Sequence, residues 1–300
     1  MVEAYFEKKK FWCSVRCKDL ILVFGKSGQV AQELQALNDI FALDRSQADL
    51  KNPKTCVNAI NEFKPSAVIN AAAYTAVEKA EEEETLANII NGDAPAEMAK
   101  ACAKLNIPFI HISTDYVFDG SGIKAWQPTD TAIPQNAYGR SKLLGEEAIS
   151  ASGATFVTLR TSWIISAIGN NFIKTMLKLS ENRTSIKVIA DQIGGPTPAQ
   201  DIAQACVEIT SQLLKDPTKR GIYHFSGHPN VSWYNLANKI FNKANINIAV
   251  DPISASEYPS LAKRPKNSRL NCYKTDTMFN IPRPKWNEGL ENILTKLGRI

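Results

Sequence analysis

The sequence predicts an α/β protein built on a Rossmann-type, doubly wound parallel sheet, with a smaller, mostly C-terminal α/β substrate domain. Short apolar runs without polar alternation, such as residues 20–24, are typical of strands that are buried on both faces of a parallel sheet. These runs alternate with helical stretches as far as Leu159, which is the rhythm of repeated βαβ units. The rhythm changes after residues 160–163, and this change indicates a second domain.

The composition is that of an ordinary globular protein and excludes several classes. Of 300 residues, 44% are hydrophobic and 22% are charged, and the net charge is +5. No basic stripe interleaved with aromatic residues indicates nucleic-acid binding, and no apolar run approaches the ~18 residues of a membrane span. We expect no secretory signal, because the N-terminus lacks an apolar core segment. The six scattered cysteines are typical of reduced thiols in a cytoplasmic protein.

The change of rhythm also predicts the domain organisation. Residues 1–19 are basic, and we expect them to form an N-terminal extension without chemistry of its own. The Rossmann domain is predicted to comprise residues 20–163 and about 190–229. The second domain is predicted to comprise about 164–189 and 230–300.

The first predicted strand, residues 20–24, runs directly into a glycine-containing turn that opens a helix ending near Leu37. The pattern Gly25-x-x-Gly28-x-x-Ala31 in this context is a dinucleotide-binding motif. Its glycines let the backbone approach a ligand, and the helix N-terminus attracts a phosphate. The candidate cofactor-binding residues here are Gly25, Ser27, Gly28, Gln29 and Val30.

The second predicted strand, residues 40–43, ends at Asp44, at about the ~20-residue spacing expected for a ribose-binding carboxylate. Asp44 would favour NAD, whereas the adjacent Arg45 and Ser46 would bind the 2′-phosphate of NADP. The sequence leaves this choice open, and we expect NADPH with NADH as the alternative. Asp49 and Leu50 are assigned to the same site.

The third predicted strand, residues 67–70, is followed by Ala71, Ala72, Ala73, Tyr74 and Thr75. Small side chains at the end of a strand let a flat cofactor lie close to the backbone, although tight packing would explain them equally well. We assign Ala71, Ala72, Ala73 and Thr75 to the cofactor site.

A fourth apolar run, residues 107–112, ends in hydroxyl and carboxylate side chains that include Thr114. Farther on, Tyr138 and Lys142 stand four residues apart in a predicted helix, so both project from one face. A nearby cation favours the phenolate and can lower a tyrosine pKa by ~1–3. The sequence therefore predicts acid-base catalysis by these three residues, with a surface pair as the alternative that spacing alone allows. Tyr138 and Lys142 are also assigned to the cofactor site.

The polar run at residues 263–269 allows two interpretations. A solvated charge run is the usual one, and an arginine clamp for a diphosphate is the more specific one. The three histidines show no metal-ligand spacing, and we expect structural roles for them.

Taken together, these motifs resemble those of the extended short-chain dehydrogenase/reductases from about Leu20 to the C-terminus. The resemblance is carried by six segments in the same order: residues 24–30, 70–77, 113–118, 138–142, 160–163 and 264–270. Six ordered segments are far more specific than any one of them.

Within this family, the chain is most similar to enzymes that reduce a nucleotide-linked keto sugar. The resemblance implies transfer of hydride from NAD(P)H to the C4 ketone of dTDP-4-dehydro-6-deoxy-L-mannose, which yields dTDP-L-rhamnose. Tyr138 would protonate the alkoxide, Lys142 would hold the nicotinamide ribose and Thr114 would bind the ketone oxygen. The second domain would bind the dTDP-sugar, through Val77, Asp115, Tyr116, Trp163, Asn171, Arg264, Asn267 and Ser268.

Two departures from the family pattern concern the glycine turn and metal binding. Ala31 replaces the usual third glycine, a small change that should not block binding. Some members of the family dimerise through glutamates that share magnesium. Here Glu33 is present, but Gln200 stands where another carboxylate is expected, and an amide is a poorer ligand for a hard cation. We expect no metal, and either a monomer or a homodimer.

Two other functions remain as alternatives on the same fold. Nucleotide-sugar dehydratases typically carry an Asp-Glu pair after the strand-end threonine, whereas Asp115 is followed by Tyr116 here. A non-catalytic NADP-binding regulatory subunit could keep the cofactor site, but the joint presence of Thr114, Tyr138 and Lys142 favours an enzyme.

Overall fold

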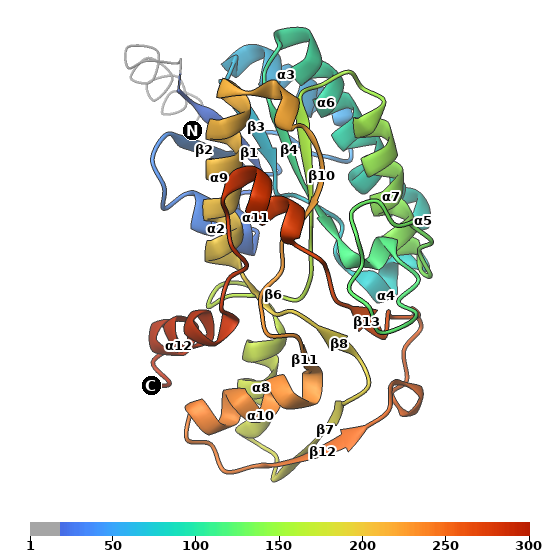
Figure 1. Ribbon diagram of the computed structural model, residues 1–300, viewed down its shortest axis with the longest axis vertical. Coiled ribbons are helices and arrows are strands. Elements are labelled where there is room, and N and C mark those ends of the chain that lie inside the picture. The colour runs from blue at the N-terminus through green and yellow to red at the C-terminus, as the bar shows by residue number, and fades with distance from the viewer. Residues whose placement is uncertain (1–18) are drawn as a thin grey trace.

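The computed structural model describes residues 19–300, so nearly all of the predicted N-terminal extension lies outside the described residues. Its centre is a six-stranded parallel sheet in the order β10-β5-β4-β3-β1-β2 (Figure 1). The strands are β1 (Ile21–Phe24), β2 (Ile40–Leu43), β3 (Ala67–Asn70), β4 (Phe109–Thr114), β5 (Phe156–Thr161) and β10 (Gly221–His224). The predicted doubly wound sheet is thereby confirmed, and its strand order reverses between β1 and β3.

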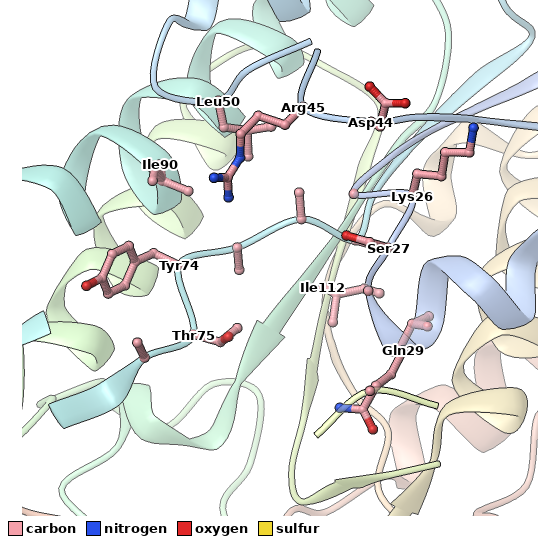
Figure 2. Close-up of a pocket in the computed structure, with 18 of the residues that line it drawn as sticks. Lys26, Ser27, Gln29, Asp44, Arg45, Leu50, Tyr74, Thr75, Ile90 and Ile112 are labelled. Atoms are coloured by element: carbon pink, nitrogen blue, oxygen red, sulfur yellow. The ribbon is translucent and has the colours of Figure 1, made fainter. Parts of the chain in front are cut away.

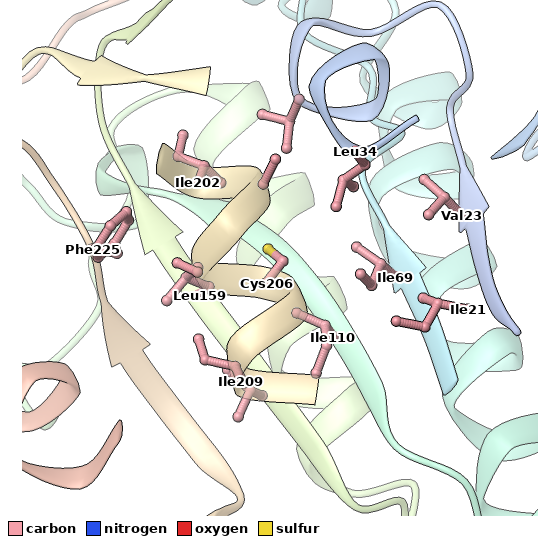
Figure 3. Close-up of a cluster of buried hydrophobic side chains, with 14 of the residues drawn as sticks. Ile21, Val23, Leu34, Ile69, Ile110, Leu159, Ile202, Cys206, Ile209 and Phe225 are labelled. Atoms are coloured by element: carbon pink, nitrogen blue, oxygen red, sulfur yellow. The ribbon is translucent and has the colours of Figure 1, made fainter. Parts of the chain in front are cut away.

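Helices cover both faces of this sheet, which explains why its strands are apolar throughout. One face carries α2 (Gln29–Leu34) and α9 (Ala199–Lys215), and the other carries α3 (Pro53–Phe63), α6 (Ala94–Leu105) and α7 (Ala137–Ser150). Side chains alternate between these faces along β1. Val23 packs in the cluster that contains Ile202 of α9 (Figure 3), whereas Phe24 packs with Ile60 and Met98 on the opposite face.

A second lobe lies below the sheet in Figure 1 and has its own hydrophobic core. It contains α8 (Phe172–Ser180), β7 (Ser185–Ile189), α10 (Trp233–Lys243), β12 (Ala249–Ile253) and α12 (Trp286–Lys296), with β7 and β12 paired in parallel. These elements lie within the residues predicted for the second domain. Helix α11 (Tyr273–Phe279) packs elsewhere: its Phe279 belongs to the core of the large sheet and contacts Tyr223 at a ring distance of 4.9 Å.

Short elements complete the chain between these larger ones. They are α4 (Val77–Ala80), α5 (Glu84–Asn88), the π-helical turn Ile89–Asp93, and the 3-10 turns Asp115–Val117, Pro217–Lys219 and Ala255–Glu257. Two small sheets lie where the chain passes between the lobes. One pairs β6 (Ile164–Ile165) with β9 (Thr197–Pro198). In the other, β8 (Ile193–Gly194) lies between β11 (Val231–Ser232) and β13 (Asn267–Ser268). None of the helices within residues 19–300 has the length and apolar character needed to cross a bilayer.

Candidate active site

A cavity of about 600 Å³ lies at the carboxyl ends of β1, β2 and β3, where the strand order of the sheet reverses (Figure 2). Ligands of doubly wound proteins bind at this point of the sheet. Every predicted cofactor residue lines this cavity: Gly25, Ser27, Gly28, Gln29, Val30, Asp44, Arg45, Asp49, Leu50, Ala71, Ala72, Ala73, Thr75, Tyr138 and Lys142. The structure thus brings together residues from four separate sequence segments.

The glycine turn after β1 fits the close approach of a dinucleotide. Gly25 adopts a φ of +99°, and a Cβ atom built on it would lie 2.8 Å from the Cα and N atoms of Ala72. The Gly28 amide closes the turn by donating to the Gly25 carbonyl over 2.8 Å. Only glycine permits this backbone at this separation, so the turn forms a cradle of bare backbone at the start of α2.

The end of the cavity near β2 combines a carboxylate with basic side chains. Asp44 Oδ1 accepts hydrogen bonds from the Ser46 hydroxyl at 2.6 Å and from the Ser46 amide at 2.9 Å. The hydroxyl contact is the main reason that the Asp44 pKa lies below its usual value. Figure 2 shows the Arg45 guanidinium directed into the cavity and Lys26 on the same side as Asp44. This end could therefore accommodate either a ribose hydroxyl or a 2′-phosphate.

Tyr138 stands at the start of α7, whose N-terminus is capped by Asn136. The Asn136 Oδ1 atom accepts from the Gly139 amide over 2.7 Å, which fixes the first turn of the helix. The Tyr138 ring contacts Tyr116 edge-on, with the ring centroids 5.4 Å apart. Thr114, the last residue of β4, hydrogen-bonds the phenol. The predicted catalytic threonine and tyrosine therefore meet at one wall of the site.

The pKa of Tyr138 differs from the sequence expectation. Burial raises it above the usual value, and the hydrogen bond with Thr114 opposes this rise only in part. Asp115 and Tyr116 raise it further. The lowering expected from Lys142 is therefore not found, because burial outweighs the effects that oppose it.

Lys142 is 1% exposed, and burial lowers its pKa to about 7, with the nearby Glu146 acting in the opposite direction. Its Nζ atom donates to the Ile112 carbonyl over 2.8 Å and lies 2.9 Å from Nε2 of His111. Burial, together with Lys142, places the pKa of His111 well below its ordinary value. Two residues of β4 thus fix the position of the Lys142 amine, and the same side chain lines the cavity.

Polar residues next to Tyr138 come from the turn that follows β4. Asp115 is 2% exposed, and its Oδ2 atom finds no hydrogen-bond partner among residues 19–300. Burial raises the Asp115 pKa to about 6, although the hydroxyls of Ser268 and Thr114 act against this rise. Burial also raises the pKa of Tyr116 to about 12, against the effect of Arg264. Three predicted substrate residues, Asp115, Tyr116 and Ser268, therefore lie in one group.

Arg264 reaches this group from a distant part of the chain because Glu78 holds it. Its Nη2 atom donates to Glu78 over 2.6 Å, and the same carboxylate accepts from the amides of Leu261 and Ala262 at 2.8 and 2.9 Å. Val77, another predicted substrate residue, precedes Glu78 at the start of α4. The role of Glu78 could not be predicted from the sequence, since no local pattern relates it to residues about 180 positions away.

The remaining predicted substrate residues have partners within the protein. Trp163 adopts a φ of +50° and stacks on Trp233 with the ring centroids 3.5 Å apart. Asn171 caps α8 and donates to Gln29 and to the Ser166 carbonyl. Asn267 donates to backbone carbonyls of residues 121 and 124. Direct contact of these three residues with a substrate stays a prediction.

Several further residues line the cofactor cavity that the sequence did not indicate. They include Lys26, Tyr74, Ala76, Ile90, Ile112, Ser113, Ile164, Gly169 and Asn170. Lys26 lies between the two glycines of the motif, so its position could have been inferred from the sequence. Ile90 and Gly169 come from elements that show no cofactor pattern, and only the fold brings them to the cavity.

The two positions considered for metal binding lie on a separate, smaller cavity. Glu33 and Gln200 both line it, and Lys296 Nζ lies 3.7 Å from the Glu33 carboxylate. Within residues 19–300, no three or more His, Cys, Asp or Glu side chains are grouped as metal ligands. The absence of a bridging metal at Glu33 and Gln200 stays a prediction.

A parallel sheet with a dinucleotide-sized cavity at its switch point, into which the helix α7 directs a tyrosine and a lysine, is the arrangement of short-chain dehydrogenase/reductases, and the chain is an oxidoreductase of that class. The family model described as "RmlD substrate binding domain" matches residues 19–299. The chain belongs to this family, that of the dTDP-4-dehydrorhamnose reductases.

Individual relatives agree with this membership. The dTDP-4-dehydrorhamnose reductase of Aggregatibacter actinomycetemcomitans is 40% identical over 91% of this chain and 97% of its own. The enzyme of the same name from Escherichia coli K12 is 38% identical, over 92% and 97% of the two chains. A crystal structure of such a reductase from Clostridium acetobutylicum superposes with a TM-score of 0.87 at 35% identity, covering 93% of this chain and 99% of the other. A structure from Bacillus anthracis, in complex with NADP, has a TM-score of 0.86 at 34% identity over the same shares.

Proposed function

We propose that this protein uses NADPH to reduce the C4 ketone of dTDP-4-dehydro-6-deoxy-L-mannose, which gives dTDP-L-rhamnose. The observation that carries this proposal is the hydrogen bond between Thr114 and Tyr138, beside the cavity that Tyr138 and Lys142 line at the switch point of the sheet. The names of the relatives and the NADP found in the Bacillus anthracis structure support the choice of substrate and cofactor.

The proposed mechanism assigns proton donation to Tyr138. NADPH, once bound, would supply the hydride, and the alkoxide that develops at C4 would need a proton. The phenol of Tyr138 keeps its proton at neutral pH, as a tyrosine with the ordinary pKa of about 10 does, and it acts as the general acid. The Thr114 hydroxyl positions the substrate oxygen against the phenol, and Lys142 orients the nicotinamide ribose. Placed donors of this kind stabilise charge that develops in the transition state.

The substrate would bind next to Tyr138, between the turn after β4 and the segment that carries Arg264. The guanidinium of Arg264 is suited to a diphosphate oxygen, because its planar fork presents several N–H groups at once. Asp115, Tyr116 and Ser268 would contact the sugar. The free, buried thiols of Cys56, Cys102, Cys206 and Cys272 support a reducing cytoplasmic location for the enzyme.

The test is a coupled assay with the keto sugar nucleotide generated in situ and either NADPH or NADH. We expect ketone-dependent oxidation of the cofactor, with dTDP-L-rhamnose as the product. Tyr138→Phe should lower kcat by roughly 10²- to 10⁴-fold, whereas Tyr273→Phe, at a side chain that is 72% exposed, should match the wild type. Cofactor binding without any turnover would overturn the proposal and favour a regulatory subunit.

A further inference from the structure

Trp163 has a backbone conformation that a bulky side chain rarely adopts. Its φ is +50°, in the left-handed region, and its carbonyl accepts from the Thr197 amide over 3.0 Å. This conformation is unfavourable for a tryptophan, so it persists only where the surrounding structure enforces it. Such conformations cluster at functional sites, which makes Trp163 a candidate for a role beyond packing.

Both faces of the Trp163 indole are covered by the protein. Trp233 stacks on one face, with the ring centroids 3.5 Å apart and the ring planes inclined by 10°. A Cβ atom built on Gly194 would lie 2.7 Å from Cε2 of Trp163, and 2.9 and 3.0 Å from its two neighbours Nε1 and Cζ2. The shortest distance is to the middle atom, which places Gly194 above a ring face rather than at an edge. Two rings 3.5 Å apart leave no room between them, so Gly194 covers the opposite face.

Trp233 is itself held in place by the second lobe. It directly follows Ser232, whose hydroxyl caps α10, so the backbone of Trp233 belongs to the fixed first turn of this helix. Its ring also contacts Phe172 of α8, with the centroids 4.6 Å apart. The stack on Trp163 therefore rests on two helices of the second lobe.

Gly194 connects this stack to the group of side chains around Tyr138. It pairs in register with Ser268 of β13, and the hydroxyl of Ser268 hydrogen-bonds Asp115, which raises the pKa of Tyr138. Trp163 thus lies against the strand next to the one that carries Ser268. The φ of Gly194 is outside the left-handed region, so this position needs a glycine for its contact with the indole and not for backbone freedom.

The edge of the Trp163 indole carries an unused hydrogen-bond donor. Within residues 19–300, its Nε1 atom makes no hydrogen bond, yet it is not among the buried polar atoms that lack a partner, so it is accessible. The indole N–H groups of Trp126 and Trp286 donate instead to the carbonyls of Asn267 and Pro229, over 3.1 and 2.7 Å. A tryptophan whose faces are covered and whose N–H is free can offer a ligand this donor but no stacking surface.

We propose that Trp233 and Gly194 are positioning residues that clamp Trp163 edge-on, so that its indole N–H donates to an oxygen of the sugar nucleotide. Trp163 does not stack on the thymine or on the sugar ring, because neither of its faces is free. A donor fixed in this way favours a ligand with an oxygen at that place, since any other ligand leaves the N–H unpaired. The clamp is a property of the protein alone, whereas the contact with the sugar nucleotide rests on the proposed function.

The first test is NMR on the full-length protein labelled with ¹⁵N-tryptophan. The chain has five tryptophans, and the indole signal that is lost in Trp163→Phe belongs to Trp163. In the free protein, we expect this N–H to exchange rapidly with water. Addition of dTDP-L-rhamnose should move the signal downfield and slow the exchange. A signal that stays in place while calorimetry shows dTDP-L-rhamnose to be bound would overturn the inference.

The clamp is tested on the same protein without ligand. At a separation of 3.5 Å, the ring current of Trp233 shifts the ring protons of Trp163 upfield. Trp233→Leu should abolish this shift, and Trp233→Phe should keep most of it because it retains an aromatic ring. Unchanged ring-proton shifts of Trp163 in Trp233→Leu would reject the clamp.

Steady-state kinetics provide the second test. In Trp233→Leu, the KM for the keto sugar nucleotide should rise about fivefold, as the loss of one hydrogen bond predicts, while kcat and NADPH affinity stay constant. Gly194→Ala should act in the same way, because its Cβ displaces the indole. Trp233→Phe should restore the KM. Tyr234→Leu changes the next residue of α10, which packs on the same core, and controls for general loss of packing.

The outcomes separate this inference from the proposed function. Equal rises of KM in Trp233→Leu and Tyr234→Leu would contradict the positioning role, even in a protein that reduces the keto sugar. A shift of the Trp163 signal by dTDP-L-rhamnose in a protein that reduces no keto sugar would leave the inference standing and reject the proposed reaction. Should Trp233→Leu fail to fold, Gly194→Ala and the wild-type spectra decide.

Discussion

The cofactor side and the sugar-nucleotide side of the site are built by different means. The cofactor side consists of a glycine turn and the ends of three neighbouring strands, so its shape comes from backbone and small side chains. The sugar-nucleotide side depends on contacts between distant segments. Glu78 bonds Arg264, and Asn136 donates to the Lys263 carbonyl, across 186 and 127 residues of sequence. The first side is therefore a property of local sequence, and the second is a property of the finished fold.

The largest expected effect comes from breaking the cofactor side at Gly25. Gly25→Ala places a Cβ 2.8 Å from the Ala72 backbone at a φ of +99°. Strain of about 1–3 kcal/mol would appear as weaker NADPH binding, by roughly 10- to 100-fold. Gly153→Ala has a similar φ of +78° but open space around it, so it should lower stability and leave cofactor affinity intact. Titration of both variants by fluorescence checks this, and equal cofactor affinities would contradict the backbone cradle.

On the sugar-nucleotide side, Asp115 should contribute a pH-dependent cost to stability. Its pKa is raised to about 6 from 3.8, so the folded protein holds this proton more tightly than the unfolded chain does. The proton on Asp115 therefore stabilises the folded state. This contribution to the free energy of unfolding is fully present below about pH 4 and is lost as the pH rises through 6. Relative to the wild type, Asp115→Asn should therefore gain roughly 2 kcal/mol in unfolding free energy between pH 4.5 and pH 8.

Urea unfolding at the two pH values measures this gain for Asp115→Asn. Asp276→Asn on α11, where no comparable burial applies, is the control. Parallel stability curves for wild type and Asp115→Asn would show that the carboxyl is ionised at no cost.

Glu78→Gln should weaken the sugar-nucleotide side alone. It removes the charge that holds Arg264 and the amides of Leu261 and Ala262, so the KM for the sugar nucleotide should rise about tenfold, or about 1.4 kcal/mol. NADPH affinity should not change. Glu82→Gln, on an exposed side chain of the same region, serves as the comparison in steady-state kinetics. A joint loss of NADPH and substrate affinity would show that the two sides are not separable.

The smallest effect should come from Arg45, whose guanidinium extends into the cavity. If it binds the 2′-phosphate, Arg45→Ala should weaken NADPH by about fivefold, or about 1 kcal/mol. NADH lacks this phosphate, and its affinity should stay constant as an internal reference. Equal losses for both cofactors would mean that Arg45 supports the cavity wall instead.

This contrast also explains how far the sequence alone could predict the site. The strands Ile40–Leu43 and Ala67–Asn70 have the predicted bounds, because short apolar runs are local signals. The helix that begins at Gln29 ends at Leu34 rather than near Leu37, a boundary that depends on tertiary packing. All of the predicted cofactor residues line one cavity, because each belongs to a motif that can be recognised within its own segment of the sequence.

Residues without a local signal were missed or misjudged. The stacking partner of Trp163, Trp233, comes from α10 and is invisible until the second lobe is in place. The expected lowering of the Tyr138 pKa by Lys142 was wrong in direction, because spacing along a helix shows proximity but not burial. Desolvation depends on the packing of whole elements, and a sequence pattern does not report it.

The strand order also bears on synthesis of the chain at the ribosome. β5 is complete at Thr161, but its outer neighbour β10 begins only at Gly221, after the chain has passed through α8, β7 and α9. At about 5–20 residues per second, the ribosome needs roughly 3–12 seconds to translate this interval. During that time the unpaired edge of β5 can pair with other nascent chains. Slow translation between these two strands should therefore favour aggregation, and the final sheet strand protects the nascent enzyme as soon as it emerges.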